Sequence, residues 1–137
     1  MVGVLIITHG NLGNELINAT ELIRGDLKDV VAISVDAGKG VENLTKEIAS
    51  AIKKVDSGRG VLILTDLFGG TPSNISLSFL KEKKVEVVTG VNLPMMLKIS
   101  ERGEEKNLGE FAAHIRDYGK KNIYLAGEIL NRKANNK

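Results

Sequence analysis

Short apolar runs recur along the chain, and segments with helical periodicity separate them. The runs are rich in β-branched residues and show no polar alternation, which is typical of parallel strands covered on both faces. They lie at residues 2–7, 30–35, 60–64 and 85–88. Apolar positions recur at helical spacing in the first two intervening segments, at Leu12, Leu16, Ala19 and Ile23 and then at Val41, Leu44, Ile48, Ile52 and Val55.

Strands that alternate with helices predict a doubly wound α/β fold with a mainly parallel sheet, because right-handed crossovers place helices on both of its faces. We expect the common strand order 2-1-3-4. After the fourth strand come the helical segments "LPMMLKIS" and "NLGEFAAHIRDYGKK", and then a strand-like run, "NIYLA", at 122–126. We expect a single domain over residues 1–130 and a frayed basic tail over residues 131–137.

The composition excludes several classes of protein. None of the 137 residues is a cysteine, so a disulfide framework and a thiolate zinc site are both impossible. The net charge is only +2, and three Phe, two Tyr and no Trp offer few rings for stacking bases, which argues against nucleic-acid binding. The chain shows neither a signal peptide nor an apolar run long enough to span a membrane, so we expect a cytoplasmic protein.

The candidate reactive pair is His9 with Asp66. His9 follows the first apolar run, in "LIITHGNLGNEL", and Asp66 follows the third, in "LILTDLFGGTPSN". Ligand sites of open α/β sheets lie outside the carboxyl ends of the strands, where the strand order reverses. Because the first and third strands are neighbours in the order 2-1-3-4, we expect the two side chains to meet.

The segment "GGTPSN" after Asp66 has the pattern of a loop that leads into a helix. Its residues are Gly69 and Gly70 in the loop, Thr71 as the expected N-cap, Pro72 at the first helical position, and Ser73 and Asn74 in the first turn. Free backbone N–H groups and the helix dipole make such an end attractive to anions. By itself the motif favours the simpler interpretation of a well-capped helix, and only its place after Asp66 shifts the balance toward anion binding.

These features together suit phosphoryl transfer through a histidine. If the carboxylate of Asp66 accepts the N–H of one ring nitrogen of His9, it fixes the tautomer and leaves the other nitrogen free to attack phosphorus. We expect no cofactor. The loop "DAGKGVEN" (36–43) lacks the Walker spacing, so Lys39 is expected in solvent, and no GxGxxG motif follows the first strand.

Three other kinds of site fit the residues less well. One histidine and one aspartate are too few ligands for a metal centre, and a triad of Ser73, His9 and Asp66 would lack the G-x-S-x-G elbow. A response-regulator receiver shares the expected fold and also ends its third strand in an aspartate. It needs an acidic pair after the first strand, however, and this chain has "THGN" there.

The second histidine, His114, is expected at the surface. The apolar stripe of its helix consists of Leu108, Phe111, Ala112, Ile115 and Tyr118. His114 lies on the flank of that stripe, near Glu110 and Asp117, where helical spacing favours a solvated side chain.

Three segments in this order, "ITHGNLGNEL", "LTDLFGGTPSN" and "VVTGVNLPMMLKI", resemble the IIA component of the mannose-family sugar phosphotransferase system over most of the chain. The resemblance implies that His9 is phosphorylated and that Asp66 hydrogen-bonds it. It also implies that the "GGTPSN" helix start stabilises the phosphoryl group, with Thr71 and Ser73 as the first candidates. The other implied residues are Gly69, Gly70 and Asn74 at the phosphoryl group, and Thr8, Phe68, Asn92 and Pro94 at the pocket rim.

The resemblance implies partners as well. His9 would accept a phosphoryl group from HPr and pass it to a IIB component, which serves the membrane IIC and IID components. Because the sequence stops at Lys137, IIB is expected to be a separate protein. The family further implies a homodimer that exchanges its C-terminal strand, here residues 122–126. Two alternatives stay open: the phosphotransferase subunit of a dihydroxyacetone kinase, and a non-catalytic module that senses phosphorylation state.

Overall fold

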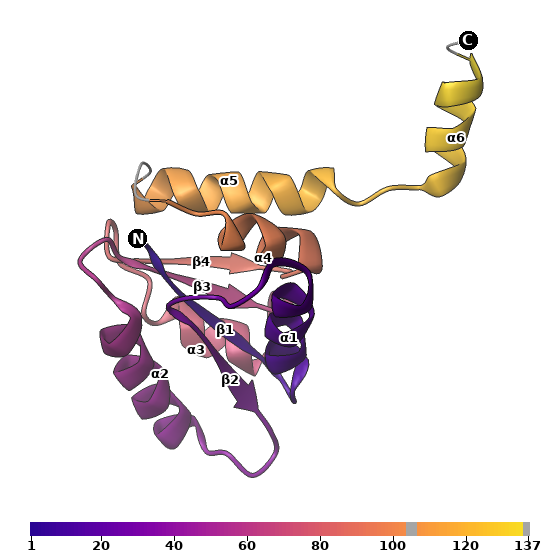
Figure 1. Ribbon diagram of the computed structural model, residues 1–137. Helices are drawn as coiled ribbons and strands as arrows, with labels where there is room; N and C mark the ends of the chain where they lie inside the picture. The colour runs from indigo at the N-terminus through magenta and orange to yellow at the C-terminus, as the bar shows by residue number, and fades with distance from the viewer. Residues whose placement is uncertain (104–106, 136–137) are drawn as a thin grey trace.

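The computed structural model describes residues 1–103 and 107–135, with side chains up to residue 132. The described elements are β1 (Gly3–His9), α1 (Leu12–Arg24), β2 (Val30–Val35), α2 (Val41–Val55), β3 (Val61–Thr65), α3 (Thr71–Leu77), β4 (Val85–Thr89), α4 (Leu93–Ser100), α5 (Leu108–Lys121) and α6 (Ala126–Asn135). The described strands form one parallel sheet in the order β2-β1-β3-β4 (Figure 1). The predicted fold class and strand order are therefore confirmed.

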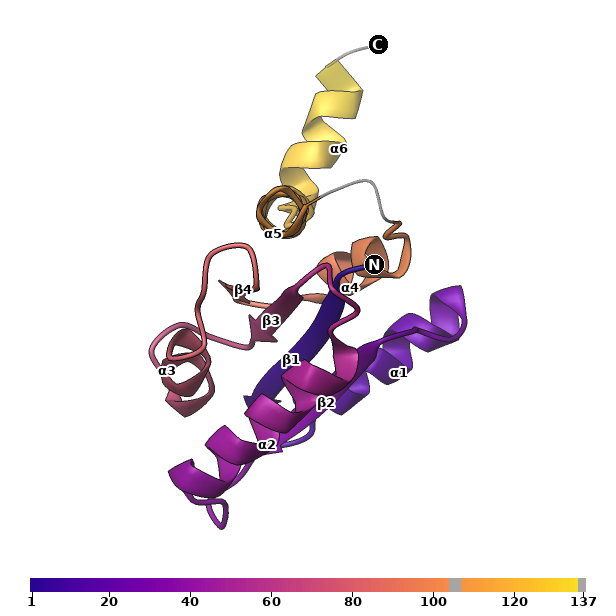
Figure 2. The ribbon, with the colours of Figure 1, turned by 90° about the vertical axis from the view of Figure 1, so that its left-hand side faces the viewer.

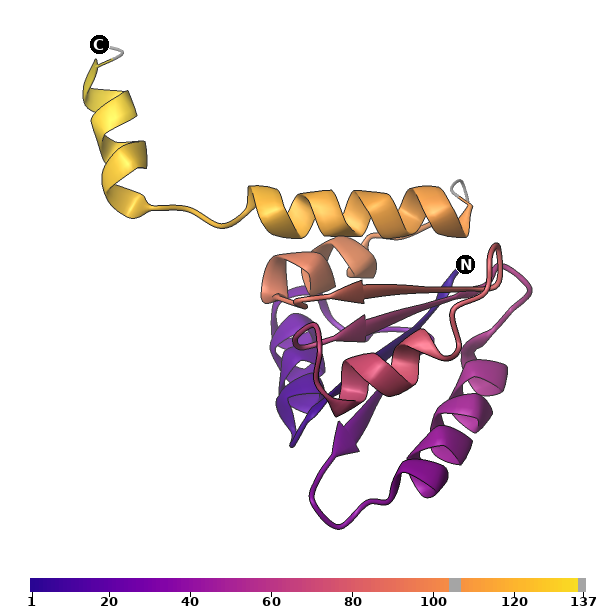
Figure 3. The same ribbon diagram turned by 180° about the vertical axis from the view of Figure 1, so that it is seen from behind.

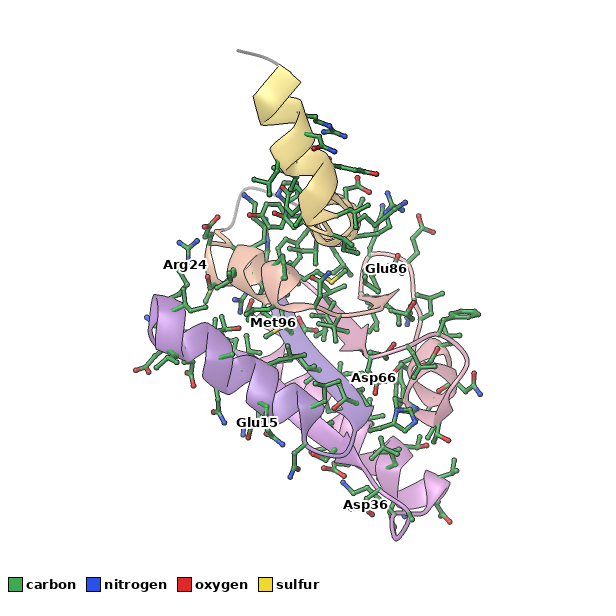
Figure 4. The ribbon with its side chains drawn as sticks, turned by 90° about the vertical axis from the view of Figure 1, so that its right-hand side faces the viewer. Glu15, Arg24, Asp36, Asp66, Glu86 and Met96 are labelled. Carbon is green, nitrogen blue, oxygen red and sulfur yellow. The ribbon has the colours of Figure 1, made fainter. Side chains whose placement is uncertain are left out.

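Helices cover both faces of the sheet, with α1, α4 and α5 on one face and α2 and α3 on the other (Figure 2). Alternate residues of β1 enter the two apolar layers, because successive side chains of a strand point to opposite faces. Val4 and Ile6 pack under α4 and α5, while Leu5 and Ile7 pack against α2 and α3. Met96, on the inner side of α4, is fully buried in the first layer (Figure 4).

The buried face of α1 differs from the prediction. Leu12 and Ile23, which the periodicity placed in the core, are 46% and 55% exposed. Gly13 is buried instead, and a Cβ atom there would lie 3.2 Å from Cγ2 of Ile6. The close approach at this glycine turns the helix, so that its partly buried Leu16 and Ile17 pack against the sheet.

The other two predicted helix faces are largely confirmed. In α2, Leu44, Ile48 and Val55 are buried, whereas Val41 in the first turn is 63% exposed. The predicted stripe of α5 is buried from Leu108 to Ile115, as Leu108, Phe111, Ala112 and Ile115. Among the described helices, none is long and apolar enough to cross a membrane.

The strand predicted at 122–126 was expected to be exchanged between two subunits, and it does not form within this single chain, which leaves the exchange a prediction. Residues 123–125 have no regular structure and α6 begins at Ala126. The segment leads away from the sheet (Figures 1 and 3). A strand needs a neighbour to pair its backbone groups, and here none lies alongside. Residues 131–135, predicted as a frayed end, belong to α6, and residues 136–137 lie outside the described part of the chain.

Candidate functional site

His9 and Asp66 meet at the carboxyl edge of the sheet, as predicted. His9 is the last residue of β1 and Asp66 directly follows β3, and these strands are hydrogen-bonded neighbours. Asp66 lies between the end of the sheet and α3 (Figure 4). The side chain of His9 is 52% exposed and that of Asp66 only 10% exposed. The imidazole is therefore open to a partner while the carboxylate is sheltered.

Two hydrogen bonds connect the pair through one oxygen. Oδ2 of Asp66 lies 2.8 Å from Nδ1 of the His9 ring and accepts the backbone N–H of His9 at 3.0 Å. The other oxygen, Oδ1, accepts the backbone N–H of Leu67 at 3.0 Å. A carboxylate held this way is an acceptor only, so it selects the His9 tautomer that carries the proton on Nδ1. Nε2 is then left with its lone pair.

The pKa of Asp66 reflects two opposing influences. Burial raises the pKa of the carboxyl, but the hydrogen bonds from the ring and backbone of His9, together with the charge of the imidazole, outweigh it. The pKa therefore lies below its ordinary value of 3.8. At neutral pH the residue is ionised and can stabilise positive charge on the imidazole.

The loop after Asp66 brings a glycine against the reactive ring. Gly69 has a φ of +97°, a left-handed conformation that favours glycine. At Gly70 a Cβ atom would lie 3.0 Å from Cε1 and 3.4 Å from Nε2 of His9. The backbone thus passes close to the nitrogen that Asp66 leaves free. Phe68, predicted at the rim, is 73% exposed.

The start of α3 is displaced by one residue from the predicted position. Gly70, not Thr71, is the N-cap, because its carbonyl accepts the first helical bond, from the N–H of Asn74 at 2.9 Å. Thr71 and Asn74 are exposed at the surface. Ser73 is fully buried, and its Oγ has no hydrogen-bond partner among the described residues.

Two of the residues predicted at the pocket rim, Thr8 and Asn92, have other contacts in the fold. Thr8 is fully buried, and its Oγ1 accepts the backbone N–H of Gly13 at 2.8 Å, which fixes the start of α1. Asn92 caps α4 by accepting the N–H of Met95, and its amide donates to the carbonyl of Gly119 in α5. The alternation of side chains along a strand could have placed Thr8 away from the pocket, because the residue next to His9 in β1 faces the opposite side of the sheet. Pro94 lies in the first turn of α4, half-buried.

The side chain of Lys39 is bound to neighbouring residues and is not free in solvent, contrary to the prediction. Its Nζ donates to the carbonyl of Ser34 at 2.8 Å and lies 3.0 Å from Oε2 of Glu47, so the side chain covers the outer edge of β2. Among the described residues, no group of three or more His, Cys, Asp or Glu is placed to hold a metal ion.

His114 is half-buried, not at the open surface as predicted. It lines a pocket of about 300 Å³ between the end of α4 and α5, together with Lys98, Arg102 and Phe111. The guanidinium of Arg102 in this pocket donates to the carbonyls of Val2, Ile99 and Lys28. Arg102 thus ties the end of α4 to the amino-terminal edge of the sheet, away from His9.

Comparison with known proteins gives a consistent result. A family model described as the fructose IIA component of the PTS system matches residues 3–116. The PTS fructose-specific EIIA component of Bacillus subtilis is 28% identical over 131 residues, which cover 95% of this chain and 90% of that protein. The sorbose-specific EIIA component of Lacticaseibacillus casei is 31% identical over 113 residues, covering 82% and 81%. The crystal structure of the phosphotransferase component EIIA from Streptococcus agalactiae covers 93% of this chain and 99% of its own, with a TM-score of 0.83 and 26% identity.

Proposed function

This chain belongs to the family of fructose IIA components of the sugar phosphotransferase system (PTS), and we propose that it carries the phosphoryl group of that system on His9. Membership makes the chain a phosphotransferase component and a phosphoryl carrier. We place it in the cytoplasm, with HPr as the phosphoryl donor and a separate IIB protein as the acceptor. The relatives are named as fructose-specific and sorbose-specific EIIA components of the PTS system, which favours this role over a dihydroxyacetone kinase subunit or a regulatory sensor.

The observation that carries the proposal is the orientation of the His9 ring. With Nδ1 bonded to Oδ2 of Asp66 at 2.8 Å, the nucleophile is Nε2, on a side chain that is 52% exposed. A protein-bound phosphoryl donor can reach such a nitrogen, since phosphoryl transfer depends mainly on positioning and charge stabilisation. The sheltered carboxylate of Asp66 supplies both the positioning of the ring and the charge stabilisation.

The transfer step follows from this geometry. The lone pair of Nε2 forms the bond to phosphorus as the bond between phosphorus and the donor breaks. The proton on Nδ1 stays in its hydrogen bond to Asp66, so the ring becomes a phosphorylated imidazolium beside a carboxylate. Attack by the IIB component reverses the step: the bond between Nε2 and phosphorus breaks, and the ring returns to its neutral form with the same tautomer.

The phosphoryl oxygens are proposed to lie against the loop and helix start at Gly70. The backbone N–H groups of Thr71 and Ser73 come before the first helical bond, which the N–H of Asn74 makes, so they are available as donors. The exposed hydroxyl of Thr71 can add a further bond. The hydroxyl of Ser73 is fully buried and has no hydrogen-bond partner among the described residues.

Intact-mass measurement with phosphoenolpyruvate, enzyme I and HPr tests this function. We expect an HPr-dependent gain of one phosphoryl group that is lost in acid and kept in base. The gain should be absent in His9→Ala and unchanged in His114→Ala, the control for the only other histidine in the sequence. Phosphorylation of His9→Ala at the wild-type rate would contradict the assignment. A base-labile product formed from acetyl phosphate and lost in Asp66→Asn would instead indicate a receiver.

We also propose that the protein is a homodimer in which residues 122–126 pair with β4 of the second copy. β4 is an edge strand, and a groove of about 310 Å³ runs between it and α5, where Gly109, Ala112 and Ala113 leave room. Three consecutive apolar side chains of the segment are 62–73% exposed, namely Ile123, Tyr124 and Leu125. Pairing with β4 would bury them.

The outer edge of β4 limits where a strand can be added. Even-numbered residues of β4 bond to β3, so the backbone groups of Val85, Val87 and Thr89 face outward. Lys81 already bonds both backbone groups of Val85, at 2.8 and 3.0 Å. The carboxylate of Glu86 accepts the N–H of Val87 and would have to move aside (Figure 4). An added strand can therefore pair from Thr89 to Val87 and must end before Val85.

A further inference from the structure

Helix α6 has little to hold it within its own chain. It is ten residues long and projects away from the sheet (Figures 1 and 3). Leu130 is 66% exposed. Isolated helices this short are marginal in water, and most helical stability in proteins comes from packing of an apolar face. The helix therefore needs a surface outside its own subunit.

The direction of the exchanged segment determines which surface α6 reaches. The segment leaves the carboxyl end of α5 and continues beyond the carboxyl edge of the sheet, in the same sense as the strands (Figures 1 and 3). In a two-fold dimer each copy must then lie beyond the carboxyl edge of the other. The segment consequently enters the second copy at that edge and runs antiparallel to β4.

An antiparallel segment ends at the start of β4. Pairing covers Thr89 to Val87 and stops at Val85, where Lys81 occupies the edge. Residues 123–125 are enough for that length, and α6 begins at the next residue, Ala126. The first turns of α6 thus emerge at the amino-terminal edge of the second copy's sheet.

A groove of about 490 Å³ lies at this place. Its lining includes Arg59, Lys83, Val85, Glu86, Leu108 and Gly109. Val85 and Leu108 form an apolar floor, 8% and 4% exposed, between side chains of both charges. The helix offers a complementary face, because Leu130 lies on the same side as Ala126 and Gly127, whose small size allows a close approach to the groove.

We propose that α6 of each copy docks in this groove of the other, with Leu130 over Val85 and Leu108. The inference rests on the proposed homodimer with exchanged segments. Docking adds a second contact between the two subunits, at the end of the sheet opposite His9. It therefore stabilises the dimer with exchanged segments without covering the phosphoryl site. The occupant of the groove is thus a second copy of this chain.

Cross-linking between two differently tagged chains tests the contact, because the natural sequence has no cysteine. Leu130→Cys is introduced in one chain and Glu82→Cys, at the rim of the groove, in the other. The two chains are co-expressed and treated with a short bismaleimide. We expect a covalent heterodimer. A matched pair of Leu130→Cys with Leu22→Cys, whose side chain on α1 is 89% exposed, should give none.

Sedimentation and phosphorylation complete the test. Leu130→Asp should raise the dissociation constant of the dimer at least about tenfold, the scale expected for losing one buried leucine, while Leu22→Asp should not change it. If the wild-type protein is a dimer but the Leu130→Cys and Glu82→Cys chains form no cross-link, the docking of α6 is overturned and the exchanged strand is not. A monomeric wild-type protein overturns both. Transfer of the phosphoryl group from HPr should be the same in all variants. A failure of the proposed carrier function can therefore be distinguished from a failure of docking.

Discussion

One oxygen of Asp66 accepts both the backbone N–H and the ring Nδ1–H of His9, at 3.0 and 2.8 Å. This double contact fixes the imidazole relative to its own backbone, so Nε2 has one direction in which to meet a phosphoryl donor. Orienting carboxylates of this kind act by selecting a tautomer and stabilising the imidazolium. The chemistry of the site is therefore set by a residue that does not itself react.

Asp66→Asn is expected to give a folded but slow carrier. The amide can still accept from His9, but it carries no charge to stabilise the imidazolium. We expect the rate of phosphorylation by HPr to fall at least about tenfold, on the scale of losing an orienting carboxylate. Rapid quench followed by intact-mass analysis measures this rate. Asp36→Asn is the matched control, since Asp36 is exposed and its carboxylate accepts the backbone N–H of Gly38. Equal rates for the two variants would contradict the role of Asp66.

The lowered pKa of Asp66 predicts a specific pH dependence of stability. A carboxyl whose native pKa lies below its unfolded value of about 3.8 stabilises the fold above that value. This contribution is lost as the pH falls through the native pKa. The difference in the free energy of unfolding between wild type and Asp66→Asn should thus be present at pH 7 and should shrink below pH 3.8. Urea unfolding at several pH values measures it, and a difference that grows on acidification would contradict the assigned shift.

Gly70→Ala should slow phosphorylation with little loss of stability. The φ of Gly70 is −91°, which any residue adopts, but the new Cβ would lie 3.4 Å from Nε2 of His9. We expect the methyl group to crowd the incoming phosphoryl group and to lower the rate at least about tenfold, since small misplacements at a reacting centre are costly. Gly40→Ala is the control, because Gly40 is also an N-cap with extended backbone and has open space around its Cβ position. An unchanged rate in Gly70→Ala would indicate that the phosphoryl group lies elsewhere.

Asn92→Ala should reduce stability more than activity. The side chain caps α4 through the N–H of Met95 and also donates to the carbonyl of Gly119. Loss of the cap and of this bond should cost about 2 kcal/mol of unfolding free energy. Denaturant unfolding measures the cost, with the exposed Asn43→Ala on α2 as a control expected within about 0.5 kcal/mol of wild type. A stable Asn92→Ala variant that is slow in phosphorylation would instead place Asn92 at the pocket.

Leu125→Asp should weaken the proposed dimer. In the single chain Leu125 is 67% exposed, so the substitution should leave the stability of the subunit unchanged. In the exchanged arrangement it would place a charge against β4 and α5. We expect a shift toward monomer in sedimentation velocity, whereas Leu22→Asp should behave as wild type. If both variants keep the wild-type oligomeric state, residues 122–126 do not form the interface.

The sequence by itself determined the alternation of strands and helices, and together with the strand order common in this class it predicted the meeting of His9 with Asp66. Both depend on local periodicity and on a general rule, that parallel strands end at one edge of the sheet. The burial of Leu44 and Ile48 in α2 followed from the same local patterns. These features need no knowledge of which distant residues touch.

Only the tertiary structure decided the features that depend on close approach between distant segments. Gly13 against Ile6 turns α1 away from its predicted face, and the backbone of Gly70 passes close to Nε2, the ring nitrogen of His9 that Asp66 leaves free. The amide of Asn92 donates to the carbonyl of Gly119 because α5 returns beside α4, which no local pattern records. Residues 122–126 have the composition of a strand but no strand beside them, because backbone pairing requires a neighbour that the chain alone does not supply.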